Sequence, residues 1–348
     1  MPNAVSPAPS LSRKRLLLIF AVYCLALGLL FLLGTEVALR LLGQGPSHSD
    51  TSESRIEPGG KLYTGHPTLG YTLLPGQFKV TLPSSYTFTM THLPEGRRIT
   101  RPFHLYNGAD EKEEIWIFGC SFTYGWSLND DETYAWTLQK SFPDYDIVNF
   151  GTSGYNTLQS FLQFLRALES KRKLKFVIVA YAHFHDERNT FIRSWRKKVS
   201  ASRQIGRIAN PYARLREDSQ LVYGMAEMKY AALPFSHSLA LMHVFENLYN
   251  EIEKRFSHSH QVTEMLLKRF AQVAKDHEIE LVIAGILDSR VTRKMLRYAK
   301  SEGMPVVDMS VNLKVKENTN DPHDPHPSGR ANEQFAAKLA AFLKDRSL

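Results

Sequence analysis

The chain has 348 residues, of which 43% are hydrophobic and 22% charged, a composition that is ordinary for a folded protein and argues against wholesale disorder. Its two cysteines are too few for a disulfide framework or a four-thiolate zinc site, so both are excluded. A net charge of +8 permits contact with anionic polymers or membranes but does not require nucleic acid, and we expect no nucleic-acid partner.

An uncharged apolar run over residues 16–34 is long enough to cross a hydrocarbon core of roughly 30 Å. Arg13, Lys14 and Arg15 precede it, and positive residues stay on the cytoplasmic side of a membrane. We therefore expect a cytoplasmic tail over residues 1–15, one transmembrane helix, and the remaining chain outside the cytoplasm. A cleaved signal peptide is the alternative, but its apolar region is shorter and ends in a small-residue cleavage site.

Two segments separate this helix from the main domain. Residues 35–61 are polar and contain Ser, Gly and Pro, a composition typical of a tether. Residues 62–110 show short β-like patterns with turn signals at Pro75-Gly76 and at residues 94–96. This segment is predicted to be a β-rich lead-in.

From residue 111 to residue 348, short apolar runs alternate with helical patterns. Continuous apolar strands separated by helices predict a three-layer α/β/α domain with a parallel five-stranded sheet covered on both faces. The predicted strands are residues 115–118, 146–149, 176–181, 281–287 and 305–309. The predicted helices are residues 133–141, 157–170, 262–275, 291–299 and 329–343. An irregular insertion at about residues 189–260 interrupts this alternation.

Chemically useful residues follow several of these strands, where parallel sheets bind ligands. Ser121 comes just after the first strand, a good position for an exposed nucleophile whose backbone N–H also donates to an oxyanion. Gly154 follows the second strand and lets backbone N–H groups approach a substrate. His326 precedes the last helix, with Asp324 and Asp321 close by. A serine, a histidine and a carboxylate on one edge are the makeup of a Ser/His/Asp hydrolase.

Two histidines follow the third strand. His183 and His185 are two residues apart, so an extended strand would place both on one face, which suits a metal as well as an oxyanion. His323 and Asp324 could join them. We expect no metal, because a metal site would leave Ser121 without a role.

Four stretches of the sequence resemble the SGNH/GDSL hydrolases, in particular a membrane-anchored bacterial branch whose nucleophile motif reads roughly GDSFTFG. They are GCSFTYGWSLNDDETYAWTLQ, VNFGTSGYNTLQ, FVIVAYAHFHDERN and DPHDPHPSGRANEQFAAKLAAFL. The lead-in segment HPTLGYTLLPG also resembles the one that precedes the domain in that branch. The resemblance covers about residues 62–190 and 260–348. It implies a flavodoxin-like sheet and a reaction that needs no metal or organic cofactor.

The resemblance also implies roles for individual residues. Ser121 matches the nucleophile, and its N–H the first oxyanion donor. Gly154 matches the second donor, and His326 the general base. The family's carboxylate lies two or three residues before that histidine, which favours Asp324 here, with Asp321 as the second choice.

Two positions depart from the family's pattern. Cys120 stands where the family has an aspartate that supports the turn. The second departure is more serious, because His185 stands before Asp186 where the family has the asparagine that is its third oxyanion donor. Losing one such donor typically costs roughly 10²–10³ in rate. Either His185 or His183 takes over, with Asn189 as an outside candidate, or the enzyme is slow, or the site no longer hydrolyses esters.

The resemblance implies a serine esterase acting on O-acyl esters, above all O-acetyl esters, of cell-surface or exported polysaccharide or of lipid. It places the protein in a bacterial inner membrane, held by one helix, with its catalytic domain in the periplasm. One alternative is a polysaccharide O-acetyltransferase that uses the same triad and receives acetyl groups from a membrane acyltransferase partner. The other is a non-catalytic glycan-binding or assembly component that keeps the fold.

Overall fold

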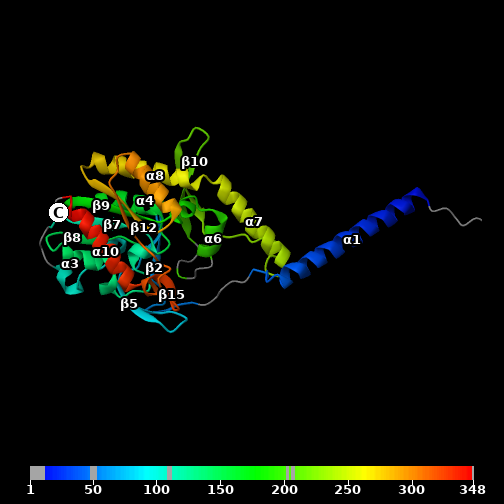
Figure 1. Cartoon of the computed structure of the whole chain (residues 1–348), viewed down its shortest axis with the longest axis horizontal. Helices are drawn as coiled ribbons and strands as arrows, with labels where there is room; N and C mark the ends of the chain where they lie inside the picture. Colours follow the sequence, from blue (N-terminus) through cyan, green and yellow to red (C-terminus); the bar gives the residue numbers. More distant parts are fainter. Residues whose placement is uncertain (1–11, 48–52, 108–111, 201–203, 205–207, 347–348) are drawn as a thin grey trace, which may run out of the picture. The chain divides into compact units, whose positions relative to one another are not determined.

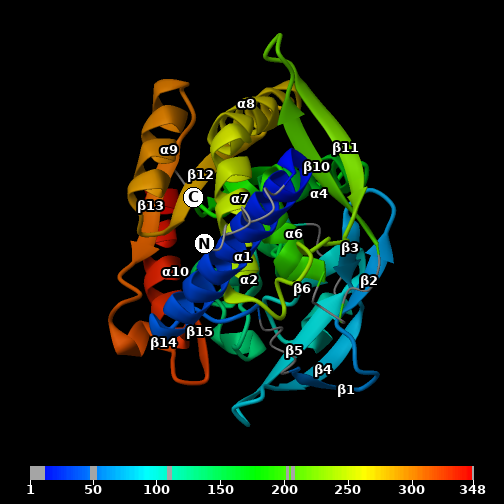
Figure 2. The same cartoon turned by 90° about the vertical axis from the view of Figure 1, so that its right-hand side faces the viewer.

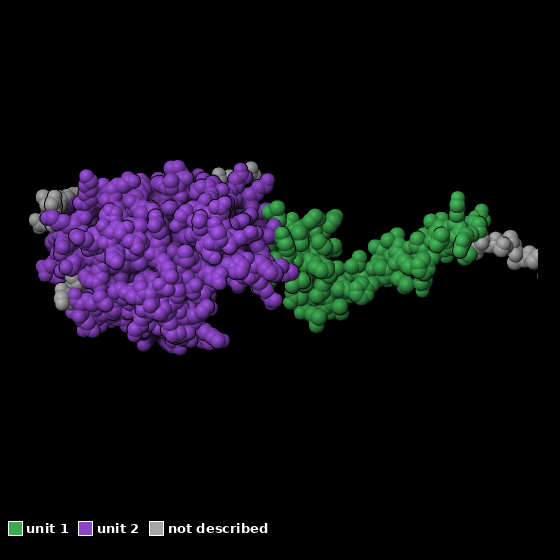
Figure 3. Space-filling view, turned by 90° about the horizontal axis from the view of Figure 1, so that it is seen from above, with its two compact units in different colours: residues 1–50, 231–251 green, residues 51–230, 252–348 purple. Residues whose placement is uncertain are grey.

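The computed structural model describes most of the chain (Figure 1). The described residues are 12–47, 53–107, 112–200, 204 and 208–346. Most of the predicted cytoplasmic tail lies outside them. The chain divides into two compact units, residues 1–50 with 231–251 and residues 51–230 with 252–348, which Figure 3 shows in separate colours.

The first unit contains α1 (Arg13–Leu41), which, within the described part of the chain, is the one helix long and apolar enough to cross a membrane. The helix continues past residue 34, so the predicted tether begins later than expected. Glu36, near its end, accepts backbone hydrogen bonds from Ala240 and Leu241, each at 2.9 Å. These N–H groups open α7 (Ala240–Phe256), so the carboxylate satisfies donors that a helix N-terminus leaves free.

The second unit is built on a nine-stranded sheet in the order β1-β4-β5-β6-β8-β7-β9-β12-β13. The last five strands in this order are parallel, which confirms the predicted parallel sheet. They are β8 (Asp146–Asn149), β7 (Glu114–Phe118), β9 (Leu174–Tyr181), β12 (Glu280–Leu287) and β13 (Val306–Val311). The chain order reverses at β7, and such a switch point opens a crevice at the carboxyl ends of the strands.

Helices cover both faces of the parallel strands, because successive strand residues point to opposite sides. Ile117 of β7 packs in a core with α3 (Tyr134–Ser141) and α10 (Gly329–Lys344). Trp116, its neighbour in β7, belongs to the opposite core. That core is covered by α4 (Thr157–Leu168), α8 (Ser259–Asp276) and α9 (Arg290–Ser301). The three layers therefore follow from the apolar runs of the sequence.

The lead-in extends the sheet instead of standing apart from it. Four strands continue the sheet in antiparallel fashion: β1 (Arg55–Glu57), β4 (Gly76–Thr81), β5 (Thr87–Leu93) and β6 (Arg97–Arg98). β1 lies in the predicted tether, so that boundary was wrong. Figure 2 shows these strands on one side of the view and α9 and α10 on the other. A separate hairpin pairs β2 (Tyr63–His66) with β3 (Gly70–Leu73).

The predicted insertion is more ordered than its irregular pattern suggested. Its described residues include a helix, a hairpin and a second, longer helix, which are α6 (Arg193–Ser200), the pair β10 (Ala209–Leu215) and β11 (Leu221–Glu227), and α7. The short helix α5 (His185–Asn189) ends where the predicted insertion begins.

His92 joins the lead-in to the turn that carries Ser121. Its side chain is 2% exposed, with Nδ1 2.9 Å from Leu74 O and Nε2 2.7 Å from Tyr124 Oη. Nδ1 therefore donates its proton to the carbonyl, and Nε2 accepts from the tyrosine. Burial lowers the pKa of His92 to about 3, so the ring is neutral in the folded protein.

This burial predicts a stability that falls as the pH falls. In the unfolded chain, His92 becomes protonated below about pH 6.5. In the folded chain it stays neutral until about pH 3. We expect the free energy of unfolding to fall by about 1.5 kcal/mol from this group between pH 6.5 and pH 5. Urea unfolding at both pH values measures the change. An equal fall in His92→Gln would contradict the assignment.

Candidate active site

Ser121 follows β7 after a tight turn and is the first residue of a short helix, α2 (Ser121–Tyr124). The residue is 7% exposed. The turn requires glycine at position 119, because a Cβ atom on Gly119 would lie 2.2 Å from Thr123 Oγ1 and 3.2 Å from Ala180 Cβ. Ser121 is thus held at the carboxyl end of β7.

The structure brings Ser121, His326 and Asp324 into one hydrogen-bonded chain. His326 Nε2 lies 3.0 Å from Ser121 Oγ, and His326 Nδ1 lies 2.6 Å from Asp324 Oδ1. A carboxylate only accepts, so Nδ1 carries the proton and donates it to Asp324. Nε2 is then free to accept the serine O–H. The arrangement can therefore draw a proton from the hydroxyl.

Asp324 belongs to a small hairpin of β14 (Thr319–Asn320) and β15 (Asp324–Pro327). Its carboxylate also accepts from Trp126 Nε1 at 3.0 Å and from the His326 backbone N–H at 2.8 Å. Burial raises the pKa of Asp324, but the hydrogen bonds and the charge of His326, together with Trp126, outweigh it and hold the pKa below its usual value. Asp324 is therefore ionised at neutral pH.

Asp321, the second choice of carboxylate, lies elsewhere. Its side chain is exposed and accepts a hydrogen bond from Thr319 Oγ1 at 3.1 Å. Asp324, and not Asp321, therefore contacts the histidine.

Hydrogen bonds fasten the loop after β8 to the nucleophile turn. Asn149 Nδ2 donates to Thr123 O at 3.0 Å, and Asn149 Oδ1 accepts the Gly151 N–H at 2.9 Å. The Thr152 N–H donates to Gly119 O at 3.1 Å. The loops after β7 and β8 are thus held against each other.

Gly154 lies in the second of these loops with a φ of +82°, a conformation that favours glycine. A Cβ atom there would lie 2.4 Å from Tyr71 Oη. Tyr71 cannot easily move away, because its hydroxyl donates to Ser153 O at 2.7 Å and its ring packs edge-on against Tyr155. Both the positive φ of residue 154 and the lack of room for a Cβ atom beside Tyr71 therefore require glycine.

We expect Gly154→Ala to destabilise the protein by about 2–4 kcal/mol, from the backbone conformation and the clash with Tyr71 together. Gly303→Ala is the matched control, because Gly303 has a φ of +81° but nothing within 4 Å of its added Cβ. It should cost only about 1–2 kcal/mol. Thermal unfolding of both variants measures the difference, and equal losses would show that the contact with Tyr71 does not matter.

His185, predicted as the substitute oxyanion donor, is fully buried. Neither ring nitrogen has a hydrogen-bond partner among the described residues. Burial first, and then the charges of Arg188 and His183, lower its pKa well below the usual value, so the ring is neutral. Its ring contacts are with Tyr181 and Phe184. A contact of His185 with the oxyanion stays a prediction.

The amide of Asn189, the outside candidate, is already in use. Its Oδ1 accepts the Leu158 N–H at 2.9 Å, and its Nδ2 donates to Thr263 Oγ1 at 2.8 Å. Asn189 therefore holds the start of α4 against α8. A contact of its second amide N–H with the oxyanion stays a prediction.

His183 lines a polar cavity of about 560 Å³. Asp186, which also lines it, accepts hydrogen bonds from Tyr181 Oη at 2.8 Å, Thr263 Oγ1 at 2.7 Å and His260 Nδ1 at 2.8 Å. Within the described parts of the chain, no three His, Cys, Asp or Glu side chains converge as metal ligands would.

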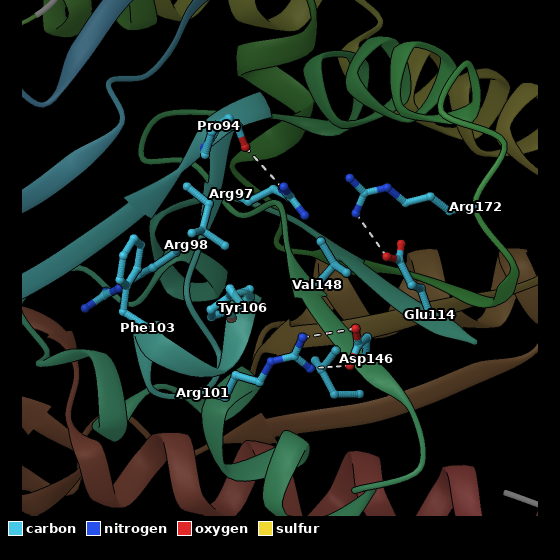
Figure 4. A pocket seen from close by; sticks show the side chains of 12 residues that line it. Pro94, Arg97, Arg98, Arg101, Phe103, Tyr106, Glu114, Asp146, Val148 and Arg172 are labelled. Atoms are coloured by element: carbon cyan, nitrogen blue, oxygen red, sulfur yellow. Dashed lines mark hydrogen bonds and ion pairs between the residues drawn. The ribbon is translucent and has the colours of Figure 1, made fainter. Parts of the chain in front are cut away.

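A second cavity, of about 390 Å³, lies by the opposite ends of the strands, since Glu114 and Asp146 begin β7 and β8 (Figure 4). Arg101 pairs with Asp146 there, and Arg172 Nη1 lies 3.0 Å from Glu114 Oε1. These arginines are neutralised by neighbouring carboxylates. The cavity is therefore separate from the triad.

Sequence reasoning missed the support around the triad. Trp126, which holds Asp324, follows the nucleophile helix in the letters GWS, and nothing in that pattern indicates its partner. Arg188 lies within the third motif, HDERN, but its contacts with other loops depend on the fold.

The comparisons with known proteins found similar solved structures. No family model and no curated protein matches the chain. A lipolytic protein of the G-D-S-L family from Desulfitobacterium hafniense is 12% identical, with 66% of this chain and 99% of that chain covered and a TM-score of 0.39. A GDSL-like lipase from Bacteroides thetaiotaomicron is 14% identical, with 67% and 89% covered and a TM-score of 0.37. The esterase EstA from Pseudoalteromonas sp. is 11% identical, with 68% and 98% covered and a TM-score of 0.37.

Proposed function

We propose that the protein is a serine ester hydrolase of the SGNH/GDSL type. The observation that supports this most is the hydrogen-bonded path from Asp324 through His326 to Ser121. A second observation supports it: Ser121 follows β7 at the carboxyl edge of the parallel sheet, where such sheets bind ligands. The sequence motifs fall in the same order as in that family.

The proposed reaction begins when His326 Nε2 takes the hydroxyl proton of Ser121. Ser121 Oγ then bonds to the ester carbonyl carbon, and the π electron pair moves onto the carbonyl oxygen. The pair returns, the bond to the alcohol oxygen breaks, and the leaving oxygen takes the proton from His326. Water repeats the sequence and releases the acid. The N–H groups of Ser121 and Gly154 would hold the oxyanion in both steps.

We propose O-acyl esters of polysaccharide or lipid, above all O-acetyl esters, as substrates. The helix α1 would anchor the protein in a bacterial inner membrane, and Arg13, Lys14 and Arg15 would keep its N-terminus in the cytoplasm. The catalytic unit would then face the periplasm.

Covalent labelling of the full chain in detergent micelles tests the proposal. A fluorophosphonate should attach to one serine, identified as Ser121 by peptide mass spectrometry, and p-nitrophenyl acetate should release acetate. Repeating the second assay with an acetylated glycan, with and without an acceptor glycan, separates hydrolysis from acetyl transfer. Absence of both labelling and hydrolysis of either ester would count against an enzyme and leave a glycan-binding component.

A further inference from the structure

Arg188 carries a partly buried positive charge that is stacked on two aromatic rings. Its guanidinium carbon lies 4.2 Å from the ring centroid of Phe184 and 4.2 Å from that of Trp195. Phe184 also packs edge-on against Phe122, and Phe122 against His326, at centroid distances of 5.8 and 5.7 Å. The stacked arginine is therefore joined to the triad through two aromatic rings.

The same guanidinium interacts with both loops that carry the proposed oxyanion donors. Its Nη1 donates to Tyr155 O at 3.1 Å, and its charge interacts electrostatically with the side chain of Cys120. Cys120 immediately precedes Ser121, and Tyr155 immediately follows Gly154. Arg188 thus interacts with one chain neighbour of each N–H group.

Within the described part of the chain, the charge of Arg188 is not balanced by a neighbouring carboxylate. The nearest acid in sequence, Glu187, pairs with Lys254 at 2.6 Å, and among the described residues no carboxylate lies within ion-pair distance of Arg188. Burial lowers the pKa of Arg188 from its usual high value, which expresses the cost of holding the charge there. A negative charge that develops nearby would recover part of that cost.

We propose that Arg188 is the positioning residue of the oxyanion site and replaces the asparagine that this chain lacks. Through its hydrogen bond to Tyr155 O and its electrostatic interaction with Cys120, it holds the loops that carry the N–H groups of Ser121 and Gly154. Its positive charge stabilises the carbonyl oxygen as that atom becomes negative. This inference rests on the proposed function.

Steady-state hydrolysis of p-nitrophenyl acetate by the full chain in detergent tests it. Arg188→Gln removes the charge and should lower kcat by about 10²-fold while KM changes by less than about threefold, because the effect acts on the transition state. Arg188→Lys keeps the positive charge, but the lysine ammonium lacks the planar, multi-donor guanidinium that interacts with both loops. The kcat of this variant should therefore fall by about tenfold. Fluorophosphonate labelling of Ser121 should slow in the same order.

Arg214→Gln is the matched control, since Arg214 is also stacked on an aromatic ring, Tyr212, at 4.8 Å, but is exposed on the β10–β11 hairpin. It should leave kcat unchanged. Wild-type kcat in a folded Arg188→Gln or Arg188→Lys variant would overturn the inference, as would a loss confined to KM. If Arg188→Gln does not fold, Arg188→Lys decides alone. A wild-type chain without Ser121-dependent hydrolysis would instead refute the proposed function.

Discussion

Ser121→Ala is expected to lower kcat for ester hydrolysis by about 10⁴–10⁶-fold and to abolish fluorophosphonate labelling. The alanine has no oxygen to bond to the carbonyl carbon, while His326 and Asp324 keep their mutual hydrogen bond of 2.6 Å. Folding should be little affected, because the change removes one oxygen atom, whose hydrogen bond to His326 Nε2 is 3.0 Å long. Rates of acetate release from p-nitrophenyl acetate, with thermal unfolding as a check, measure the effect.

Ser141→Ala provides the control for this variant. Ser141 ends α3, and its hydroxyl donates only to Thr137 O within its own helix, at 3.3 Å. Its kcat should equal that of the wild type. Residual activity in Ser121→Ala within tenfold of the wild type would show that another group attacks the ester, and the proposed mechanism would fail.

Asp324→Asn is the second large effect, with an expected loss of about 10⁴-fold in kcat. Asp324 now accepts from His326 Nδ1, from Trp126 Nε1 and from the His326 backbone, all of them donors. An amide offers one oxygen and one NH₂ group, so it cannot accept from both sides. Where its NH₂ faces His326, the ring must place its proton on Nε2, and it can then no longer take the proton of Ser121.

The neighbouring Asp321→Asn is the matched control for Asp324→Asn. Asp321 lies three residues earlier on the same hairpin, but it is exposed and accepts from Thr319 at 3.1 Å. Its kcat should stay within about threefold of the wild type. A larger loss from Asp321→Asn than from Asp324→Asn would transfer the orienting role to Asp321. The lowered pKa of Asp324 keeps this carboxylate ionised at neutral pH, so the hydrogen bond that orients His326 is present in the assay.

The parallel sheet could be predicted because each of its strands is a continuous apolar run, which can be recognised from the residues of that strand alone. Trp116 and Ile117, for example, are adjacent in sequence and enter the two opposite cores. The antiparallel extension could not be predicted in this way, because β1 is three residues long and is defined by its pairing with β4. Which strand pairs with which depends on the whole fold, and the sequence of a three-residue strand does not indicate its partner.

The candidate site shows the same division. Ser121 and His326 stand beside strands or helices that the sequence reveals, so their convergence could be expected. The choice between Asp324 and Asp321 depended on a hairpin of two short strands. Strands this short show no hydrophobic periodicity from which they could be predicted. Arg188 was missed for another reason: its hydrogen bond to Tyr155 O and its electrostatic interaction with Cys120 join residues that lie far apart in sequence.

The separation of 205 residues between the two ends of the Ser121–His326 hydrogen bond has a consequence for the making of the protein. A ribosome completes the nucleophile turn early, but the base arrives only with the hairpin just before α10, the last helix described. A growing or prematurely terminated chain would carry Ser121 without its base. The ability to hydrolyse an ester would therefore be acquired late in synthesis, and a chain cut before residue 319 would remain inert.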